Sequence, residues 1–256
     1  MFLLFLLPCL IVPILAADRC SVIPPSLWCS NSDLISECGF KEHCDRYSTA
    51  TRNKPIQLTV LIEALCPDCQ NWIIQELYPK IYKSFNGFVN IELVPYGNAK
   101  VVNGSTVCQH GEQECMINKF ESCLIDSVES QDQFIPLIYC IEQNLKDGVT
   151  FDKASAKCFR TYSVGDDVQR MVQSCLVSKL GQRLQDKAAA RTANVWPEKH
   201  THVPWILFNN VSLSSSQMLL NDVPSLICQW YSGDKAIPYC NQDEKKRYKK
   251  VSHKNF

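Results

Sequence analysis

Two cysteines separated by two residues follow an apolar run in the stretch "LIEALCPDCQNW", which spans Leu61 to Trp72. A Cys-x-x-Cys pair such as Cys66 and Cys69 can bind a metal ion, form a structural disulfide or act as a redox centre. Thiolate metal sites persist where thiols stay reduced, whereas disulfides are typical of oxidising compartments. The compartment of the protein and the elements around the pair therefore decide between these chemistries.

The first residues of the chain predict secretion. Residues 1–17 are almost wholly apolar and end in Ala16 and Ala17, small residues that suit signal peptidase. This pattern is typical of a cleaved signal peptide. A membrane-spanning helix needs roughly 20 apolar residues, and this run is shorter and contains Pro8 and Pro13, which disfavours an uncleaved anchor. No later stretch is apolar for long enough to cross a bilayer, so stable membrane insertion is not expected.

Cysteine content agrees with an oxidising compartment. The chain has fifteen cysteines, and loss of Cys9 with the signal peptide leaves an even number. The sequences "NGS" at Asn103 and "NVS" at Asn210 are acceptors for N-glycosylation in the same compartment. A formal net charge of +0 argues against a nucleic-acid partner.

Four of the cysteines lie between Cys20 and Cys44, a segment too short to bury a core without covalent help. Its pattern, C-x(3)-P-P-x(2)-W-C-x(8)-C-G-x(4)-C, resembles the saposin A-type domain. We therefore expect a disulfide-stapled module over residues 18–47, with His43 as a surface residue rather than a metal ligand. A polar linker is expected over residues 48–55.

After this linker the sequence predicts a βαβ unit. Ile56 to Leu65 is rich in β-branched and aliphatic residues and indicates a buried strand. A helix follows, with apolar residues at four-residue spacing and a kink predicted at Pro79. Asn86-Gly87 ends the helix, and alternation from Val89 to Leu93 predicts a second strand, parallel to the first.

The Cys-x-x-Cys pair falls where the first strand gives way to the helix. Unpaired N–H groups and the helix dipole at a helix N-terminus stabilise a thiolate, so Cys66 is predicted to be the nucleophile and Cys69 the resolving thiol. Pro67 suits the first helical position. Asp68 is ambiguous, because its carboxylate disfavours a nearby thiolate yet could interact with the helix dipole or accept a proton from Cys69.

The rest of the chain is predicted to be a helical insertion over about 112–193, a hairpin in "VPWILFNNVSL" that turns at Asn209-Asn210, and a last helix over 223–230. Residues 241–256 form a basic tail that is expected to be disordered or removed.

This order resembles the thioredoxin-like oxidoreductases that carry a helical insertion. The fold class expected is therefore α/β, a thioredoxin-like fold over 56–240 with a disulfide-bonded helical insertion, plus the small N-terminal module. The resemblance implies a cis proline packed against the redox pair, and Pro204 in "HVPW" stands in the matching place.

The stretch "CQHGEQECMINKFESC" matches C-Q-H-G-x(2)-E-C-x(2)-N-x(4)-C residue for residue. That pattern resembles the signature of the gamma-interferon-inducible lysosomal thiol reductase family. The resemblance implies a soluble, glycosylated reductase of protein disulfides in lysosomes or late endosomes, with some of the protein also secreted, with no bound cofactor and with a small-molecule thiol as external reductant. It also implies mainly structural roles for the signature residues, namely Cys108, Gln109, His110, Gly111, Glu114, Cys115, Asn118 and Cys123.

Three alternatives concern the histidines. His110 could orient a group or transfer a proton in catalysis, although a structural role is preferred. A zinc site made of Cys66, Cys108, His110 and Cys115 is disfavoured, because an oxidising compartment consumes thiolate ligands, and no metal is expected. His200 and His202 could face the active site and titrate between about pH 5 and 7, but solvated loop positions are preferred.

Twelve cysteines remain outside the Cys66–Cys69 pair, enough for six disulfides. If the four N-terminal cysteines pair among themselves, they allow 3 possible connectivities, and the remaining eight cysteines allow 105. The cysteines expected in structural disulfides are Cys20, Cys29, Cys38, Cys44, Cys108, Cys115, Cys123, Cys140, Cys158, Cys175, Cys228 and Cys240.

Activity in acid sets a requirement on Cys66. An ordinary thiol with a pKa of about 8.5 is ionised to only a few parts in ten thousand at about pH 5. A pKa of about 5 gives roughly a thousandfold more thiolate and, after the loss of intrinsic nucleophilicity, a net gain of about a hundredfold. We therefore expect the pKa of Cys66 to be strongly lowered.

Two other functions fit the sequence. The protein could be a disulfide oxidase or isomerase of the secretory pathway, although the ending "HKNF" is not a retention signal such as KDEL. It could also be a non-enzymatic, partner-binding glycoprotein in which Cys66–Cys69 is a fixed disulfide.

Overall fold

The computed structural model describes residues 20–128 and 130–241. The chain divides into two compact units, Met1–Arg52 and Asn53–Phe256. The predicted signal peptide and all of the predicted tail except Asn241 lie outside the described residues.

The described part of the first unit is held by disulfides rather than by an apolar core. Cys20 bonds Cys38, and Cys29 bonds Cys44. Of its described residues only Cys44 is buried, and the ring of Trp28 stacks on Phe40 with centroids 4.6 Å apart. Its elements are η1 (Pro25–Leu27), α2 (Ser32–Glu37) and α3 (Lys41–Thr51).

Helix α3 extends over the first residues of the predicted linker, up to Thr51. The helix has no apolar stripe to reveal it in the sequence. Ion pairs four residues apart, Lys41 with Asp45 and Glu42 with Arg46, support it instead.

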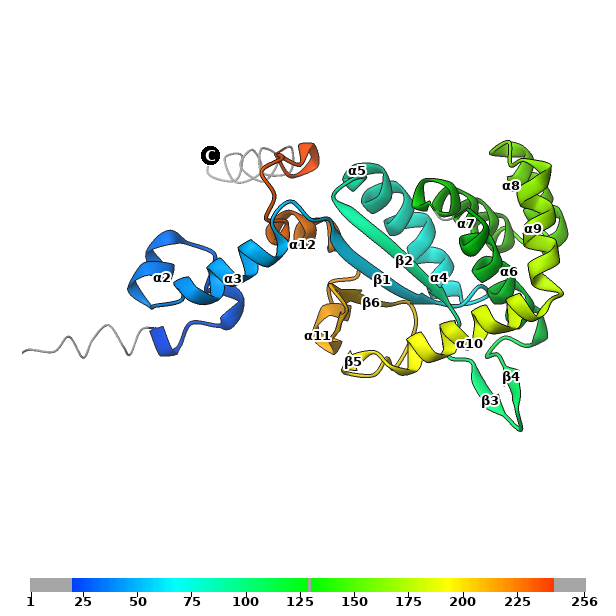
Figure 1. The fold of residues 1–256 in the computed structure, drawn as a ribbon, viewed down its shortest axis with the longest axis horizontal. Coiled ribbons are helices and arrows are strands. Elements are labelled where there is room, and N and C mark those ends of the chain that lie inside the picture. Colours follow the sequence, from blue (N-terminus) through cyan, green and yellow to red (C-terminus); the bar gives the residue numbers. More distant parts are fainter. Residues whose placement is uncertain (1–19, 129, 242–256) are drawn as a thin grey trace, which may run out of the picture. The chain divides into compact units, whose positions relative to one another are not determined.

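A five-stranded sheet forms the centre of the second unit, with strand order β2-β1-β6-β7-β5 (Figure 1). The strands are β1 (Ile56–Ile62), β2 (Val89–Pro95), β5 (Trp196–Pro197), β6 (Trp205–Phe208) and β7 (Val211–Ser212). β1 pairs parallel to β2 and antiparallel to β6. The parallel βαβ unit predicted from the sequence is confirmed.

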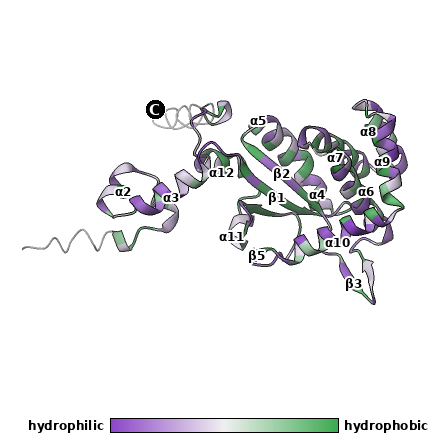
Figure 2. Cartoon of the chain, viewed as in Figure 1, coloured by the Kyte–Doolittle hydropathy of each residue, from purple (hydrophilic) through white to green (hydrophobic). Residues whose placement is uncertain are grey.

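Strand β1 is apolar along most of its length (Figure 2), and Leu58, Val60 and Leu61 have no exposed surface. It ends at Ile62, three residues earlier than predicted. The segment from Glu63 to Leu65 thus leaves the sheet and leads directly into the helix that carries the cysteine pair.

That helix begins as α4 (Pro67–Trp72), continues as the π-helix η2 (Ile73–Tyr82) and ends as α5 (Lys83–Phe85). Pro79, where a kink is predicted, lies inside this π-helix, and its missing N–H removes one backbone hydrogen bond there. Gly87, with φ of +81°, follows the helix end as predicted.

The helical insertion consists of α6 (Glu112–Val128), α7 (Gln131–Lys146), α8 (Phe151–Thr161), α9 (Asp166–Leu176) and α10 (Lys179–Ala193). Disulfide Cys123–Cys175 joins α6 to α9, and Cys140–Cys158 joins α7 to α8. Figure 1 shows α6 to α9 grouped at one end of the sheet, with α10 running back toward β5.

Smaller elements complete the unit. A hairpin of β3 (Lys100–Val102) and β4 (Ser105–Val107) is absent from the prediction; Asn103 lies at its exposed tip. Asn209 and Asn210 turn between β6 and β7 with φ of 49° and 65°, as predicted. Helices α11 (Ser214–Gln217) and α12 (Val223–Trp230) follow. Within the described residues, no helix combines the length and apolarity needed to cross a membrane.

Candidate active site

Cys66 is the N-cap residue of α4, and Pro67 occupies the first helical position. The backbone N–H of Cys69 donates to Cys66 Sγ at 3.4 Å. Both side chains are buried, and they are the free cysteines among the described residues. The sequence thus positions one sulfur where unpaired helix donors can stabilise it as a thiolate.

The peptide bond between Val203 and Pro204 is cis, as the thioredoxin-like resemblance implies. The sulfur of Cys66 donates to the carbonyl oxygen of Val203 at 3.8 Å. The start of β6 therefore lies against the cysteine pair, although the two segments are far apart in the sequence.

A groove of about 330 Å³ opens beside the pair. It runs between α4 and the segment that follows β7, and Trp72 forms part of its wall by donating its indole N–H to the carbonyl of Leu220 at 2.9 Å. Met218 lines the groove and is 82% exposed.

The two thiols have opposite electrostatic environments. The pKa of Cys66 is lowered to about 7, chiefly by a hydrogen bond from the Cys69 thiol and also by the backbone N–H groups of Cys69 and Asp68, against burial and the charge of Glu63. Burial raises the pKa of Cys69. Cys66 is thus the easier of the two to ionise, although its pKa does not reach the value of about 5 expected for acid chemistry, because burial and Glu63 oppose ionisation.

Asp68 is exposed, and its carboxylate side chain lines the groove. Its backbone N–H stabilises the Cys66 thiolate. The contribution of Asp68 to the cysteine pair therefore comes from its main chain.

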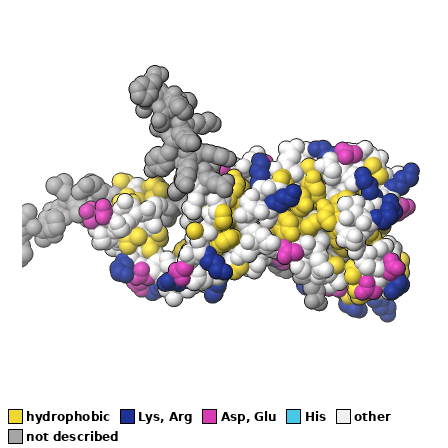
Figure 3. Space-filling view, turned by 90° about the horizontal axis from the view of Figure 1, so that it is seen from above, with side chains coloured by type: hydrophobic (Ala, Val, Ile, Leu, Met, Phe, Trp, Pro, Cys, Tyr) yellow, Lys and Arg dark blue, Asp and Glu magenta, His cyan; other side chains and the backbone are white. Residues whose placement is uncertain are grey.

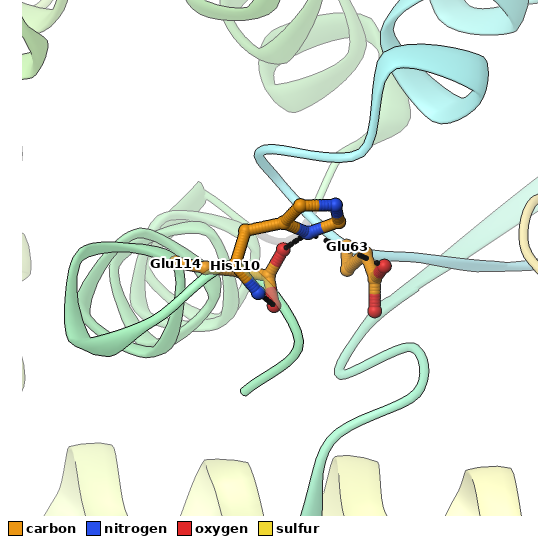
Figure 4. A group of neighbouring side chains, drawn as sticks. All are labelled: Glu63, His110 and Glu114. Atoms are coloured by element: carbon orange, nitrogen blue, oxygen red, sulfur yellow. Dashed lines mark hydrogen bonds and ion pairs between the residues drawn. The ribbon is translucent and has the colours of Figure 1, made fainter. Parts of the chain in front are cut away.

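A charged cluster beside the pair consists of Glu63, His110 and Glu114 (Figure 4). His110 Nδ1 contacts Glu114 Oε2 and lies 3.6 Å from Glu63 Oε1. Both carboxylates are buried, whereas 31% of the histidine side chain is exposed. Glu63 is absent from the sequence prediction, although an acid at the end of an apolar strand was a usable signal.

Other signature residues hold the chain around this cluster. Asn118 accepts the N–H of Ala64 at 2.9 Å, and Gln109 accepts from the side chain of Asn98 at 2.7 Å. Gly111 has a φ of +89°, which favours glycine. Cys108 bonds Cys115, and the remaining disulfide joins Cys228 to Cys240.

The geometry bears on metal binding in two ways. The zinc set that included Cys108 and Cys115 is not available, because these two sulfurs bond each other. Glu63, His110 and Glu114 bring three ligand atoms within 4.8 Å, fewer than the four of a closed zinc site, and His110 Nδ1 already contacts Glu114. An ion pair describes this cluster better than a metal centre.

The two loop histidines differ in their surroundings. His202 is exposed, lines the groove and packs edge-on against Trp205 with ring centroids 5.1 Å apart. His200 is half-buried, and burial lowers its pKa. The preferred interpretation of both as solvated therefore fits His202 better than His200.

Taken with the sheet order, the helix-capping thiol beside a cis proline defines a thioredoxin-like thiol-disulfide oxidoreductase. The sequence profile of the family described as gamma interferon inducible lysosomal thiol reductase matches residues 57–162. The chain belongs to the gamma-interferon-inducible lysosomal thiol reductase family.

Three relatives support this assignment. A goldfish (Carassius auratus) protein with the family's name is 33% identical over 229 residues, which cover 88% of this chain and 86% of the relative. A mouse (Mus musculus) protein of the same name is 31% identical over 73% of this chain and 72% of its own length. An Arabidopsis thaliana protein named gamma-interferon-responsive lysosomal thiol protein is 29% identical over 75% of this chain and 78% of its own length.

Proposed function

We propose that the protein reduces disulfide bonds of endocytosed proteins in acidic lysosomes or late endosomes and so aids their unfolding and degradation. The observation that carries the proposal is the contrast between an ionisable Cys66 at the helix N-terminus and a buried Cys69 whose pKa is raised. The lysosomal location rests on the names of the relatives.

The reaction begins when the Cys66 thiolate attacks a substrate disulfide. One substrate sulfur leaves as a thiolate and takes up a proton, while the other forms a mixed disulfide with Cys66. Cys69 then loses its proton and attacks Cys66 Sγ, which releases the second substrate thiol. The substrate gains two electrons, the Cys66–Cys69 pair is oxidised to a disulfide, and a small-molecule thiol from solution reduces it again.

The pKa of Cys66 makes this reaction practicable in acid. With a pKa of about 7, roughly 1% of Cys66 is thiolate at about pH 5, against about 0.03% for an ordinary thiol. Because a thiolate of lower pKa is a weaker nucleophile, the gain in rate is reduced by a factor of about 5, to roughly sixfold. This gain in rate is smaller than the gain of about a hundredfold expected for a pKa of about 5. Another group in the site can therefore add to the reactivity of Cys66 in acid.

Substrate binding is assigned to the groove beside Cys66. Its exposed Met218 and the edge of Trp72 suit an unfolded polypeptide, and Pro204 lies at the end nearest the thiol. On the face shown in Figure 3, basic and acidic side chains lie in small separate groups and neither sign covers the surface. This distribution supports a protein substrate rather than a nucleic acid.

The test is reduction of insulin at about pH 4.5 and about pH 7 by wild type, Cys66→Ser and Cys69→Ser, with dithiothreitol in excess. We expect wild type to raise the rate above that with dithiothreitol alone at both pH values, and neither variant to do so. The control is the double variant Cys228→Ser/Cys240→Ser, which removes a disulfide outside the site and should keep its activity. Wild-type activity at neutral pH only would refute the acid function, and a rate for Cys66→Ser above that with dithiothreitol alone would refute the role of Cys66.

A further inference from the structure

The cluster of Glu63, His110 and Glu114 has a geometry that a simple surface ion pair does not need. Its residues come from separate segments: Glu63 follows β1, whereas His110 precedes α6 and Glu114 lies in the first turn of that helix. Figure 4 shows the imidazole of His110 between the two carboxylates. Two buried negative charges thus share one partly exposed histidine as their positive partner.

The surroundings fix the carboxylate of Glu63. Its Oε2 atom accepts the backbone N–H of Asn98 at 2.8 Å. A Cβ atom at Gly97 would lie 2.3 Å from the same oxygen, so the loop approaches Glu63 as closely as a glycine permits. The other oxygen, Oε1, is buried without a hydrogen-bond partner among the described residues and faces His110 Nδ1 at 3.6 Å.

Glu114 fixes the histidine in turn. The backbone N–H of His110 donates to Glu114 Oε1 at 3.3 Å, and the ring contacts Oε2. Disulfide Cys108–Cys115 closes the short loop that contains His110. The imidazole therefore has little freedom to turn away from Glu63.

This cluster adjoins the cysteine pair, because the backbone N–H of Cys66 donates to the carbonyl oxygen of Glu63 at 3.3 Å. The charge of Glu63 raises the pKa of both Cys66 and Cys69, and Cys66 Sγ acts on His110 in turn. Coupling between titrating groups is reciprocal, so a protonated His110 favours the Cys66 thiolate by as much as the thiolate favours the imidazolium.

The pKa values of His110 and Glu63 are both shifted upward. Burial opposes the charged form of His110, but Glu114 and Glu63 raise its pKa above the ordinary value. Burial also raises the pKa of Glu63, which the N–H of Asn98 partly offsets. Glu114 on α6 also belongs to the cluster, whereas Cys69 on α4 and Glu142 on α7 are the further titratable groups that act on Cys66, the N-cap residue of α4.

We propose that Glu63, His110 and Glu114 act as a charge cluster that favours the Cys66 thiolate in acid and disfavours it at neutral pH. In acid, His110 carries a proton and Glu63 takes up part of one, so little negative charge faces the sulfur. As the pH rises, both lose their protons, and the carboxylate of Glu63 opposes the thiolate. His110 and Glu63 are thus positioning residues that act through Cys66, and the proposal deepens the acid function stated above.

The experiment measures the rate at which iodoacetamide alkylates Cys66 in the reduced full chain between about pH 4.5 and pH 8.5, with the modified peptide quantified by mass spectrometry. His110→Gln removes the positive charge, so alkylation at about pH 5 should fall roughly tenfold, which corresponds to about one pKa unit. Near pH 8.5 the two proteins should react equally, because the side chain at position 110 then carries no charge in either.

Glu63→Gln tests the opposite sign and keeps the proposal decidable if His110→Gln does not fold. It removes the charge that opposes the thiolate, so alkylation near neutral pH should rise up to about tenfold. His43→Gln, in the other unit, is the matched control and should follow wild type throughout.

Two results would overturn the proposal: alkylation profiles of His110→Gln and Glu63→Gln that coincide with wild type, or equal slowing at every pH, which a purely structural role would produce. The readout does not depend on a protein substrate. Wild type could fail to reduce insulin in acid while the alkylation profile of His110→Gln still differs from that of wild type. That result would refute the proposed function and support the charge cluster.

Discussion

Two buried glutamates, Glu121 on α6 and Glu142 on α7, are predicted to make the folded protein more stable in acid than at neutral pH. Both are almost wholly inaccessible to solvent, and the two carboxyl groups neighbour each other, with Gln70 as a further polar neighbour of Glu142. Burial raises the pKa of Glu121 to about 7. Burial and the neighbouring charge of Glu121 raise the pKa of Glu142 well above its ordinary value.

The magnitude follows from proton linkage. A rise from 4.5 to about 7 for Glu121 corresponds to about 3 kcal/mol of unfolding free energy. Because the pKa in the folded state is the higher one, this stability is fully present below about pH 4.5 and is lost as the pH rises through about 7. For a unit of this size, 1 kcal/mol shifts the melting temperature by about 2–4 °C, so the loss should be about 6–12 °C.

The assay is thermal unfolding followed by circular dichroism at about pH 5 and about pH 8, without reductant so that the disulfides stay closed. The double variant Glu121→Gln/Glu142→Gln carries no charge at these positions, so it should lose most of the pH dependence. Glu112→Gln, an exposed position in the first turn of the same helix, is the control and should keep the wild-type pH dependence.

Other groups also contribute to the pH dependence of wild type. The raised pKa values of Glu63 and His110 act in the same direction, and the lowered pKa of His200 acts in the opposite one. The decisive quantity is therefore the difference in pH dependence between wild type and the double variant. The reasoning would be refuted if the melting temperatures at about pH 5 and about pH 8 differed as much in the double variant as in wild type.

Two further predictions concern the site. Cys69→Ser should accumulate a mixed disulfide between Cys66 and the substrate, visible as a reducible adduct on non-reducing gels. The control Cys66→Ala should form no adduct. The absence of an adduct with Cys69→Ser would contradict the assigned order of attack. Gly97→Ala should destabilise the protein by about 2–4 kcal/mol, because the new methyl group would meet Glu63 and φ is positive. Gly87→Ala has a positive φ but no atom within 4 Å, so it should cost only about 1 kcal/mol; equal melting temperatures of the two variants would show that the contact with Glu63 is unimportant.

The sequence predicted those parts of the fold where local patterns are strong. Apolar runs and their alternation located β1 and β2, and Asn209-Asn210 located the hairpin that follows Pro204. The cysteine pair could be placed at a helix start because a strand pattern ends just before it and a helical pattern begins just after it.

The rest depends on contacts between distant segments. Glu63 and His110 are 47 positions apart by their numbers, and no local pattern shows that the first turn of α6 lies beside the end of β1. Disulfide connectivity was undetermined for the same reason, since Cys123 pairs with Cys175 across two intervening helices. The β3–β4 hairpin has neither strand length nor a buried face to reveal it, because most of its side chains are exposed.

The loop closed by Cys108 and Cys115 holds His110 in a small covalent ring. Under the proposed function, a protein that opens disulfides in other proteins needs this disulfide of its own to stay closed. The proposed thiol reductant would then have to reduce Cys66–Cys69 and leave Cys108–Cys115 intact. Repeated turnover would depend on that selectivity between two disulfides of one chain.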